Sequence, residues 1–330
     1  MKIAVVGCGA LGSFYGARLG RDGHDVHFVL RTDYEVVREK GVKIKSAQGD
    51  FTHRPECVRD PEEVGNADLV LIGLKTTANH QYKNLIPPLV GRETTVLTLQ
   101  NGLGNEAALA NLFPTHRIMG GLCFVCLNRT EPGVIEHIAH GRIVLGEHDR
   151  LPVNRTKEVA KIFQDAGIPC TVTDDLEKAH WEKLIWNVPF NGLGVASTAG
   201  FEACVTGELP PKSERLPTCL PTDQLLGDDN WLQLVRDLMG EVVETARALD
   251  FDLSTDLIDE NIEATRVMGA YRASTLVDFE RGSPLELESL FRAPLRHAKQ
   301  AGVDTPRLER LCQLLQQLQP IAAKPRPLAR

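Results

Sequence analysis

Short apolar runs alternate with stretches of helical periodicity through the first half of the chain. Apolar runs of about four to eight residues, bounded by glycine or polar residues, are typical of buried strands. The runs that we predict to be strands are KIAVVG (2–7), DVHFVLR (25–31), ADLVLIGL (67–74), TTVLTLQ (94–100), RIMGGLCFV (117–125) and RIVLGE (142–147). Because strands and helices alternate, the pattern predicts a mostly parallel sheet that is covered by helices on both faces.

Helical periodicity replaces the strand pattern after about residue 175. A segment rich in proline and charge, residues 205–229, predicts a surface excursion between two helices. The pattern therefore predicts two domains, an α/β domain over residues 1–175 and an all-α domain over residues 176–330. We predict helices over residues 176–194, 231–249, 254–271, 285–301 and 306–318, the third with Ser254 as its N-cap.

Length and charge narrow the class of protein. At about 100–200 residues per domain, 330 residues suffice for two domains with separate cores. The formal net charge of −7 gives no sign of the basic patch that nucleic-acid binding requires. No apolar run approaches the ~18–20 residues of a membrane span, and the N-terminal run lacks the basic start of a signal peptide. These features predict a cytoplasmic protein that binds neither nucleic acid nor membrane.

The eight cysteines are scattered along the chain, which favours reduced thiols over a disulfide framework. Cys123 and Cys126 form a C-x-x-C pair, and His137 and His140 follow in a stretch, GVIEHIAHG, that we interpret as irregular. Zinc or redox chemistry would need further ligands at suitable spacing. We therefore interpret the two cysteines as small buried side chains of a strand and predict no metal site.

The turn after the first predicted strand reads GCGALG. G-x-G-x-x-G alone is a weak signal, but here the motif follows a strand and opens a helix, as in dinucleotide-binding turns. In that setting the first glycine permits a tight turn, the second lets a pyrophosphate approach, and the third allows close packing of helix on strand. The helix N-terminus offers N–H groups to the phosphates. We predict a Rossmann-type, doubly wound domain whose cofactor contacts are Gly7, Cys8, Gly9, Ala10, Leu11 and Gly12.

The end of the second predicted strand distinguishes between cofactors. NAD enzymes usually carry a carboxylate there for the ribose 2′-hydroxyl, whereas an arginine binds the 2′-phosphate of NADP. This chain has Arg31 at that place and Asp33 two residues later, so NADP is favoured while NAD stays open. Lys75 follows another predicted strand, and we expect it at the same edge of the sheet as a second cation, unless it is simply solvated.

Polar residues mark two further places. Asn101, in LQNGLGN, directly follows a predicted strand and belongs at the edge where doubly wound sheets bind ligands, although Asn-Gly is also a common turn. In KLIWNVPFNG, Lys183, Asn187 and Asn191 recur every four residues and share one face of a helix. An ammonium group could protonate the oxygen of a ketone that hydride reduces, and the amides could bind a carboxylate or hydroxyl. The alternative is a polar stripe on a buried helix.

Two late candidates lie in YRASTLVDFERGSPLELESL. Ser274 is a plausible donor to a carboxylate, and Glu286 could orient the lysine or contact the cofactor ribose or the substrate. A glutamate that follows a proline at a helix N-terminus is also ordinary capping chemistry. Taken alone, this segment favours the capping interpretation.

The order of GCGALG, Arg31, LQNG, KLIWNVPFNG and AST…PLELE resembles the ketopantoate reductase family over essentially the whole chain. The resemblance implies an N-terminal Rossmann-type domain and an all-α, 6-phosphogluconate-dehydrogenase-like C-terminal domain. It implies NADPH-dependent reduction of 2-dehydropantoate to pantoate, a step of pantothenate and coenzyme A biosynthesis. The implied residue roles are Lys183 as proton donor, Asn187, Asn191 and Ser274 as substrate contacts, Asn101 as a contact of cofactor and substrate, and Glu286 as a cofactor-side contact.

Some positions depart from the family's pattern. Glu288 stands where the family has an aspartate, and a further substrate-binding asparagine has no match in STAGFEACV (197–205). A reductase of another 2-oxo acid therefore remains an alternative, as does a 3-hydroxyacid dehydrogenase, which shares the glycine turn and a lysine–asparagine pair. A non-catalytic NADP-binding sensor would need only the glycines and Arg31. The apolar helical faces are compatible with a homodimer or with an internal core.

Overall fold

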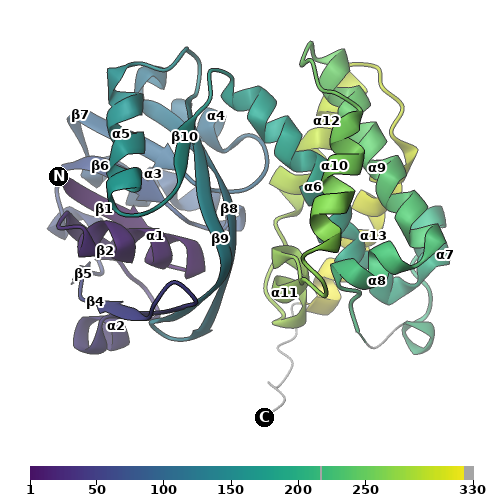
Figure 1. The fold of residues 1–330 in the computed structure, drawn as a ribbon, viewed down its shortest axis with the longest axis horizontal. Coiled ribbons are helices and arrows are strands. Elements are labelled where there is room, and N and C mark those ends of the chain that lie inside the picture. Colours follow the sequence, from purple (N-terminus) through teal and green to yellow (C-terminus); the bar gives the residue numbers. More distant parts are fainter. Residues whose placement is uncertain (216–217, 323–330) are drawn as a thin grey trace. The chain divides into compact units, whose positions relative to one another are not determined.

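The computed structural model describes residues 1–215 and 218–322 (Figure 1). The chain divides into two compact units, Met1–Glu177 and Lys178–Arg330. The N-terminal unit is a sheet covered by helices, and the described part of the C-terminal unit is helical, so the predicted fold class is confirmed. Within the described ranges, no helix is long and apolar enough to cross a membrane.

One ten-stranded sheet organises the described residues of the N-terminal unit, in the order β4-β3-β9-β8-β7-β6-β1-β2-β5, with β10 paired to β9. Each predicted strand is present. The short strands β3, β4, β5 and β10 were not predicted, because a strand of three to five residues is too short to show a clear periodic pattern. The strands are β1 Lys2–Val6, β2 Asp25–Val29, β3 Val42–Ser46, β4 Phe51–His53, β5 Glu56–Val58, β6 Ala67–Ile72, β7 Val90–Thr98, β8 Ile118–Glu131, β9 Val134–Glu147 and β10 Cys170–Val172.

The centre of the sheet is parallel. Strands β5, β2, β1, β6, β7 and β8 are neighbours in that order and pair in parallel, so their carboxyl ends lie at one edge. The chain passes from β1 to β2, forms β3 and β4 beside β9, and then forms β5 next to β2 before it returns to β6 on the other side of β1. This reversal is the topological switch point, where doubly wound sheets bind ligands. The antiparallel pairs β8–β9 and β3–β4 extend the sheet beyond this centre.

Alternation along the strands gives the sheet two apolar faces. In β1, Ile3 and Val5 belong to one buried cluster, whereas Ala4 and Val6 belong to another. Successive side chains of a strand point to opposite faces, so a strand that is apolar throughout must be covered on both. The run KIAVV therefore requires helices on each side of the sheet.

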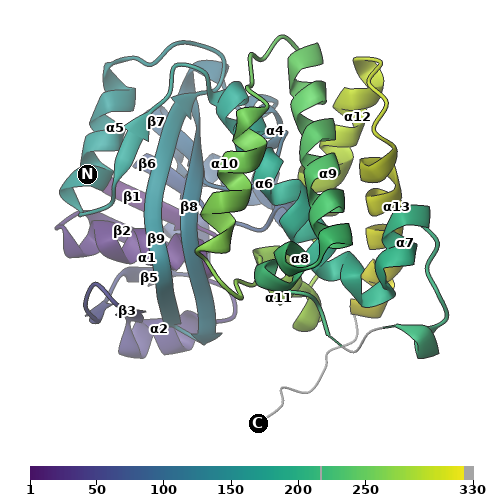
Figure 2. The same ribbon diagram turned by 45° about the vertical axis from the view of Figure 1, so that its right-hand side comes forward.

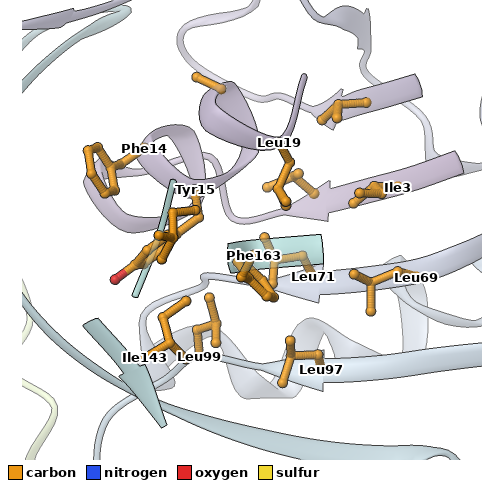
Figure 3. Close-up of a cluster of buried hydrophobic side chains, with 14 of the residues drawn as sticks. Ile3, Phe14, Tyr15, Leu19, Leu69, Leu71, Leu97, Leu99, Ile143 and Phe163 are labelled. Atoms are coloured by element: carbon orange, nitrogen blue, oxygen red, sulfur yellow. The ribbon is translucent and has the colours of Figure 1, made fainter. Parts of the chain in front are cut away.

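Helices supply that cover. Figure 3 shows the first cluster, in which Phe163 of α5 lies among side chains of the strands and Phe14 of α1 lies to one side, next to Tyr15. On the opposite face, Tyr82 of α3 and Leu109 of α4 belong to the second cluster. The helices and 3-10 turns of this unit are α1 Ala10–Arg21, α2 Tyr34–Lys40, η1 Pro61–Glu63, η2 Thr76–Gln81, α3 Tyr82–Leu85, η3 Pro87–Leu89, α4 Asn105–Ala110, η4 Thr115–Arg117 and α5 Asn154–Asp165.

The long β8–β9 hairpin corrects one prediction (Figure 2). The stretch GVIEHIAHG is not irregular, because nearly all of it belongs to β9, with Ile135 and His137 buried and Glu136 and Ile138 exposed. The pairing register shifts near His140, which has a φ of +65°. Glycine and histidine hide the alternation in the sequence, and the bulge breaks its period.

Most of the cysteines are small buried side chains. All eight are thiols outside any disulfide; six are buried, among them Cys123 and Cys126 of β8, and Cys8 and Cys57 are partly buried. His137 bonds through Nδ1 to Ser46 Oγ at 2.9 Å and through Nε2 to His140 O at 2.8 Å, so it links β3 to β9. Burial lowers the pKa of His137, which favours the neutral imidazole. Among the described residues, no group of three or more His, Cys, Asp and Glu side chains is placed to hold a metal ion.

Helices make up the described part of the C-terminal unit. The longest, α6, starts at the end of the N-terminal unit, and Pro189 within it does not end the helix. The elements are α6 Leu176–Ala196, η5 Ser197–Ala199, α7 Phe201–Thr206, η6 Lys212–Glu214, α8 Thr222–Gly227, α9 Asp229–Ala248, α10 Asp256–Arg266, α11 Ser274–Glu280, the π-helical turn η7 Glu288–Arg292, α12 Ala293–Gln300 and α13 Pro306–Ala322.

Two details of this unit differ from the prediction. Helix α10 ends at Arg266 rather than near residue 271, because the segment after it bonds to α8 instead. Thr222 donates from its backbone N–H to Tyr271 O at 3.0 Å and from Oγ1 to Gly269 O at 2.8 Å. Ser254 precedes the N-cap by one residue, although its Oγ still accepts from Asp256 N at 3.1 Å. The excursion over residues 205–229 is thus partly helical and fixes the segment that leads into α11.

Truncation of Phe163 should test how far the first cluster stabilises the N-terminal unit. Phe163 is 0 % exposed, and Phe163→Ala should lower the free energy of unfolding by about 3–5 kcal/mol, since a large buried ring leaves a cavity. Urea unfolding followed by circular dichroism measures the change. The control Leu151→Ala, at a side chain that is 69 % exposed, should change it by less than about 0.5 kcal/mol. Equal effects of the two substitutions would contradict the assigned core.

Candidate active site

The glycine turn lies at the switch point of the sheet. Gly7 follows β1 with a φ of +92°, which is strained for any residue with a side chain. A Cβ on Gly7 would lie 2.3 Å from the backbone N of Leu74, and one on Gly12 would lie 2.4 Å from Gly7 O. The turn therefore packs against the residues after β6 and against the first turn of α1, with no room for side chains.

Gly9 differs because the place of its missing side chain is open. A Cβ on Gly9 would meet no atom within 4 Å. Gly9 is also the N-cap of α1, so no side chain caps this helix, and the first turn carries no acidic residue. The N–H groups near Ala10 and Leu11 and the positive end of the helix dipole therefore suit an anion such as a pyrophosphate.

Cys8 turns its side chain away from the open side of the turn. Its Sγ lies 3.4 Å from Val5 O and 3.6 Å from Val29 O, within reach of a weak S–H donation to either. Burial raises the pKa of the Cys8 thiol well above its usual value. The side chain is therefore a neutral filler between β1 and β2, and only its backbone can contact a ligand.

The two charged candidates after β2 have different surroundings. Asp33 is buried, and Arg129 Nη1 lies 3.0 Å from both of its carboxylate oxygens. Gly133 N also donates to Asp33 Oδ2 at 3.2 Å, so the carboxylate fastens this turn to the β8–β9 hairpin. Arg31 is exposed, and its guanidinium forms no ion pair with any residue that the structure describes. An anion is therefore favoured beside Arg31.

Lys75 and Asn101 follow β6 and β7, so both stand at the carboxyl edge of the parallel strands. Buried amides join the loops that carry them. Gln100 Nε2 donates to Asn79 Oδ1 at 2.8 Å, and Asn79 Nδ2 donates to Asn105 Oδ1 at 2.9 Å. Asn105 Nδ2 in turn donates to Asn101 O at 3.1 Å. The loop after Lys75 and the loop of Asn101 are thus held to each other.

The sequence-based prediction missed the three residues whose side chains form this amide network, Asn79, Gln100 and Asn105. Gln100 and Asn105 are 4 % and 0 % exposed, so their amides are costly to bury unless they are bonded. A signal was present, because LQNGLGN places two amides directly after an apolar strand and another four residues after the second of them. Their partner Asn79 lies in η2, more than twenty residues away in the chain, so the sequence could not pair them.

Three of the predicted residues come together in the C-terminal unit. Asn191 Nδ2 donates to Asn187 Oδ1 at 3.2 Å, and Asn191 Oδ1 accepts from Ser274 Oγ at 3.3 Å. The same oxygen accepts from Thr275 N at 3.0 Å and so caps α11, whose own N-cap has no capping side chain. Because Asn187 Oδ1 faces Asn191, the Nδ2 hydrogens of Asn187 point in another direction. Lys183 lies one turn before Asn187 on α6.

Glu286 and Glu288 differ in environment. Glu286 is buried just before the π-helical turn η7, and its carbonyl oxygen accepts from Leu290 N at 3.3 Å. Glu288 is a surface residue with a side chain that is 60 % exposed, and it pairs with Arg296 at 2.5 Å. The position that departs from the family's pattern is therefore the exposed first residue of η7, and it forms a surface ion pair. Single π-helical turns are frequent at functional sites, and Glu286 lies just before this one.

Known proteins resemble this chain along most of its length. The sequence profile "Ketopantoate reductase PanE/ApbA" matches residues 3–150, and its C-terminal counterpart matches residues 218–319. A 2-dehydropantoate 2-reductase of Nostoc sp. is 37% identical over 313 residues, which cover 93% of this chain and 92% of the relative. The crystal structure of 2-dehydropantoate 2-reductase from Geobacter metallireducens is 45% identical, with a TM-score of 0.87, and covers 96% of this chain and 99% of that one. The corresponding structure from Methylococcus capsulatus is 34% identical, with a TM-score of 0.85 and 98% of each chain covered.

The N-terminal unit has a doubly wound sheet with a glycine turn at its switch point, and a helical unit follows it. With the relatives above, this architecture places the protein among the NAD(P)-dependent reductases, a class of oxidoreductases. Both profiles and the full-length relatives narrow that class. The chain belongs to the ketopantoate reductase PanE/ApbA family.

Two glycine substitutions should separate ligand binding from folding. Gly9→Ala adds a methyl group in open space at a negative φ, so the protein should fold normally yet bind NADPH about tenfold or more weakly. Gly7→Ala should instead lower the melting temperature, because the methyl group meets the backbone of Leu74. Thermal unfolding and fluorescence titration with NADPH measure both effects. Unchanged NADPH affinity in Gly9→Ala would contradict the pyrophosphate site.

Proposed function

We propose that this chain catalyses the NADPH-dependent reduction of 2-dehydropantoate to pantoate. Relatives that are 37% and 45% identical over nearly their full length carry the name of this enzyme. The observation that carries the proposal is the line of polar groups on α6. Lys183 lies one helical turn before Asn187 on this helix. Asn187 is hydrogen-bonded to Asn191, which is hydrogen-bonded in turn to Ser274 of α11.

Residues at the carboxyl edge of the N-terminal unit would hold the cofactor. The uncapped first turn of α1 would receive the pyrophosphate from Gly7 to Gly12, and Arg31 would bind the 2′-phosphate with Lys75 as a second cation. The commitment of Asp33 to Arg129 supports NADP over NAD, since the ribose 2′-hydroxyl would need a carboxylate that is not already bonded. When bound, NADPH supplies the hydride that reduces the carbonyl carbon.

Lys183 would act as the proton donor. Its ammonium group can give a proton to the carbonyl oxygen of the substrate and stabilise negative charge as that oxygen becomes an alcohol. Asn187, with its Nδ2 hydrogens oriented by Asn191, would donate to the substrate. Asn101, Asn191 and Ser274 would hold the carboxylate and hydroxyl groups of the same molecule, and Glu286 would contact the cofactor side.

Two parts of this proposal concern the setting of the enzyme. All eight cysteines are thiols outside any disulfide, which supports a reducing, cytoplasmic compartment. A second 2-oxo acid remains the alternative substrate, because the further asparagine usual in the family has no match in STAGFEACV. The same proton donor and the same cofactor residues would serve either substrate.

Removal of the ammonium group should test the proton donor. Lys183→Ala should lower kcat with saturating 2-dehydropantoate by about 10²–10⁴-fold, the usual contribution of a positioned general acid. The control Lys161→Ala removes a lysine whose side chain is 70 % exposed and should leave kcat unchanged. NADPH oxidation at 340 nm measures both. A loss of no more than about twofold in Lys183→Ala would exclude the assigned role.

The same assay with a panel of 2-oxo acids should identify the substrate. Wild-type protein should oxidise NADPH fastest, by kcat/KM, with 2-dehydropantoate. Activity with another 2-oxo acid and none with 2-dehydropantoate would overturn the named substrate while keeping the reductase chemistry.

Substitution of Arg31 should test the cofactor. Arg31→Ala should raise the KM for NADPH by about tenfold or more, because a charge-assisted hydrogen bond to the 2′-phosphate is lost, and should leave the KM for NADH unchanged. The ratio of kcat/KM for the two cofactors measures the preference. A ratio that is the same in wild type and variant would contradict the assignment.

A further inference from the structure

A second arginine stands beside Arg31 at the carboxyl edge of the sheet. Strands β2 and β5 are parallel neighbours with Val29 opposite Val58, and Leu30 N donates to Val58 O at 2.9 Å. The two strands therefore stay paired up to their last residues, and the segments that follow them leave the sheet side by side. Arg31 lies two residues after the end of β2, and Arg59 comes directly after the end of β5.

The guanidinium of Arg59 is held close to the turn that carries Arg31. Its Cζ lies 4.2 Å from the centre of the Tyr34 ring, within the range of a cation–π contact. Its Nη1 is 3.5 Å from Arg31 O, and its Nη2 is 2.8 Å from Glu35 Oε1. Three contacts with residues of one turn thus fix the position of a side chain that is still 55 % exposed.

The negative charges around Arg59 leave this guanidinium able to bind an added anion. Glu35 is 73 % exposed, and exposed ion pairs of this kind contribute little, so a phosphate dianion can compete for the guanidinium. Asp60 is turned away, because its carboxylate accepts from Glu62 N at 3.0 Å in the cap of η1. Asp33 is bonded to Arg129 and Gly133.

We propose that Arg59 is a second specificity-determining arginine, which binds the 2′-phosphate of NADP together with Arg31. The inference rests on the proposed preference for NADP and assigns a new residue to it. Two guanidinium groups can each donate a pair of hydrogen bonds to a phosphate, whereas the 2′-hydroxyl of NAD offers them no charge. The carboxylate of Glu35 holds Arg59 in place and competes with the phosphate.

Binding of cofactor fragments tests this role without catalysis. Isothermal titration calorimetry compares 2′,5′-ADP, which carries the 2′-phosphate, with 5′-AMP, which lacks it. Arg59→Ala should weaken binding of 2′,5′-ADP by about tenfold, the scale of a lost charge-assisted hydrogen bond, and leave 5′-AMP unchanged. Arg59→Lys, which keeps the charge but not the planar fork, should recover part of that loss.

Two further variants sharpen the comparison. Glu35→Gln removes the competing carboxylate and should tighten 2′,5′-ADP binding by up to about fivefold, the most that an exposed ion pair would cost. Arg92→Ala serves as the control, because this arginine is 95 % exposed near the amino end of β7, at the opposite edge, and should change neither affinity.

The outcomes distinguish the inference from the proposal beneath it. Equal weakening of 2′,5′-ADP and 5′-AMP in Arg59→Ala, or no change in either, would overturn the role of Arg59. A loss of the preference for NADPH in Arg31→Ala would still support the proposed cofactor. Wild-type protein that binds 2′,5′-ADP no more tightly than 5′-AMP would overturn the NADP preference itself, and the role of Arg59 with it.

Discussion

Close packing of bare backbone at the end of β1 is the constraint on which the rest of the N-terminal unit depends. Gly7 touches the chain after β6, and Gly12 touches Gly7, so β1, α1 and β6 meet without any side chain between them. That contact sets where α1 begins and aims its first N–H groups at the carboxyl edge. The strands on either side then deliver Arg31, Arg59, Lys75 and Asn101 to the same edge.

Apolar packing places the elements of this protein, and buried hydrogen bonds set the directions of its polar groups. Asn191 is an example, because its side chain caps α11, accepts a hydrogen bond from Ser274 and orients the amide of Asn187. The amides of Asn79 and Asn105 do the same for two loops of the N-terminal unit. Each of these amides is bonded through both its oxygen and its nitrogen, so it has a single preferred orientation, and reversing it would break these hydrogen bonds.

The sequence predicted the features that depend on neighbouring residues and missed those that depend on distant ones. The glycine turn, the parallel strands and α6 follow from local periodicity and from glycine spacing. The strand β9 was misjudged because a bulge interrupts its alternation. The role of Asp33 was left open because Arg129 lies 96 residues away, and the end of α10 was set by Thr222 in a distant helix. Local patterns carry no information about such partners.

Cys8, inside the glycine turn, bears on how the protein responds to oxidants. Peroxides attack the thiolate, and each step toward a sulfenic or sulfonic acid adds bulk and polarity. An oxidised Cys8 would push β1 and β2 apart next to the closely packed backbone of Gly7 and Gly12. Since its sulfur points between the strands and holds its proton tightly, this thiol presents little of the reactive form. The turn can therefore carry a cysteine at its centre without becoming a redox switch.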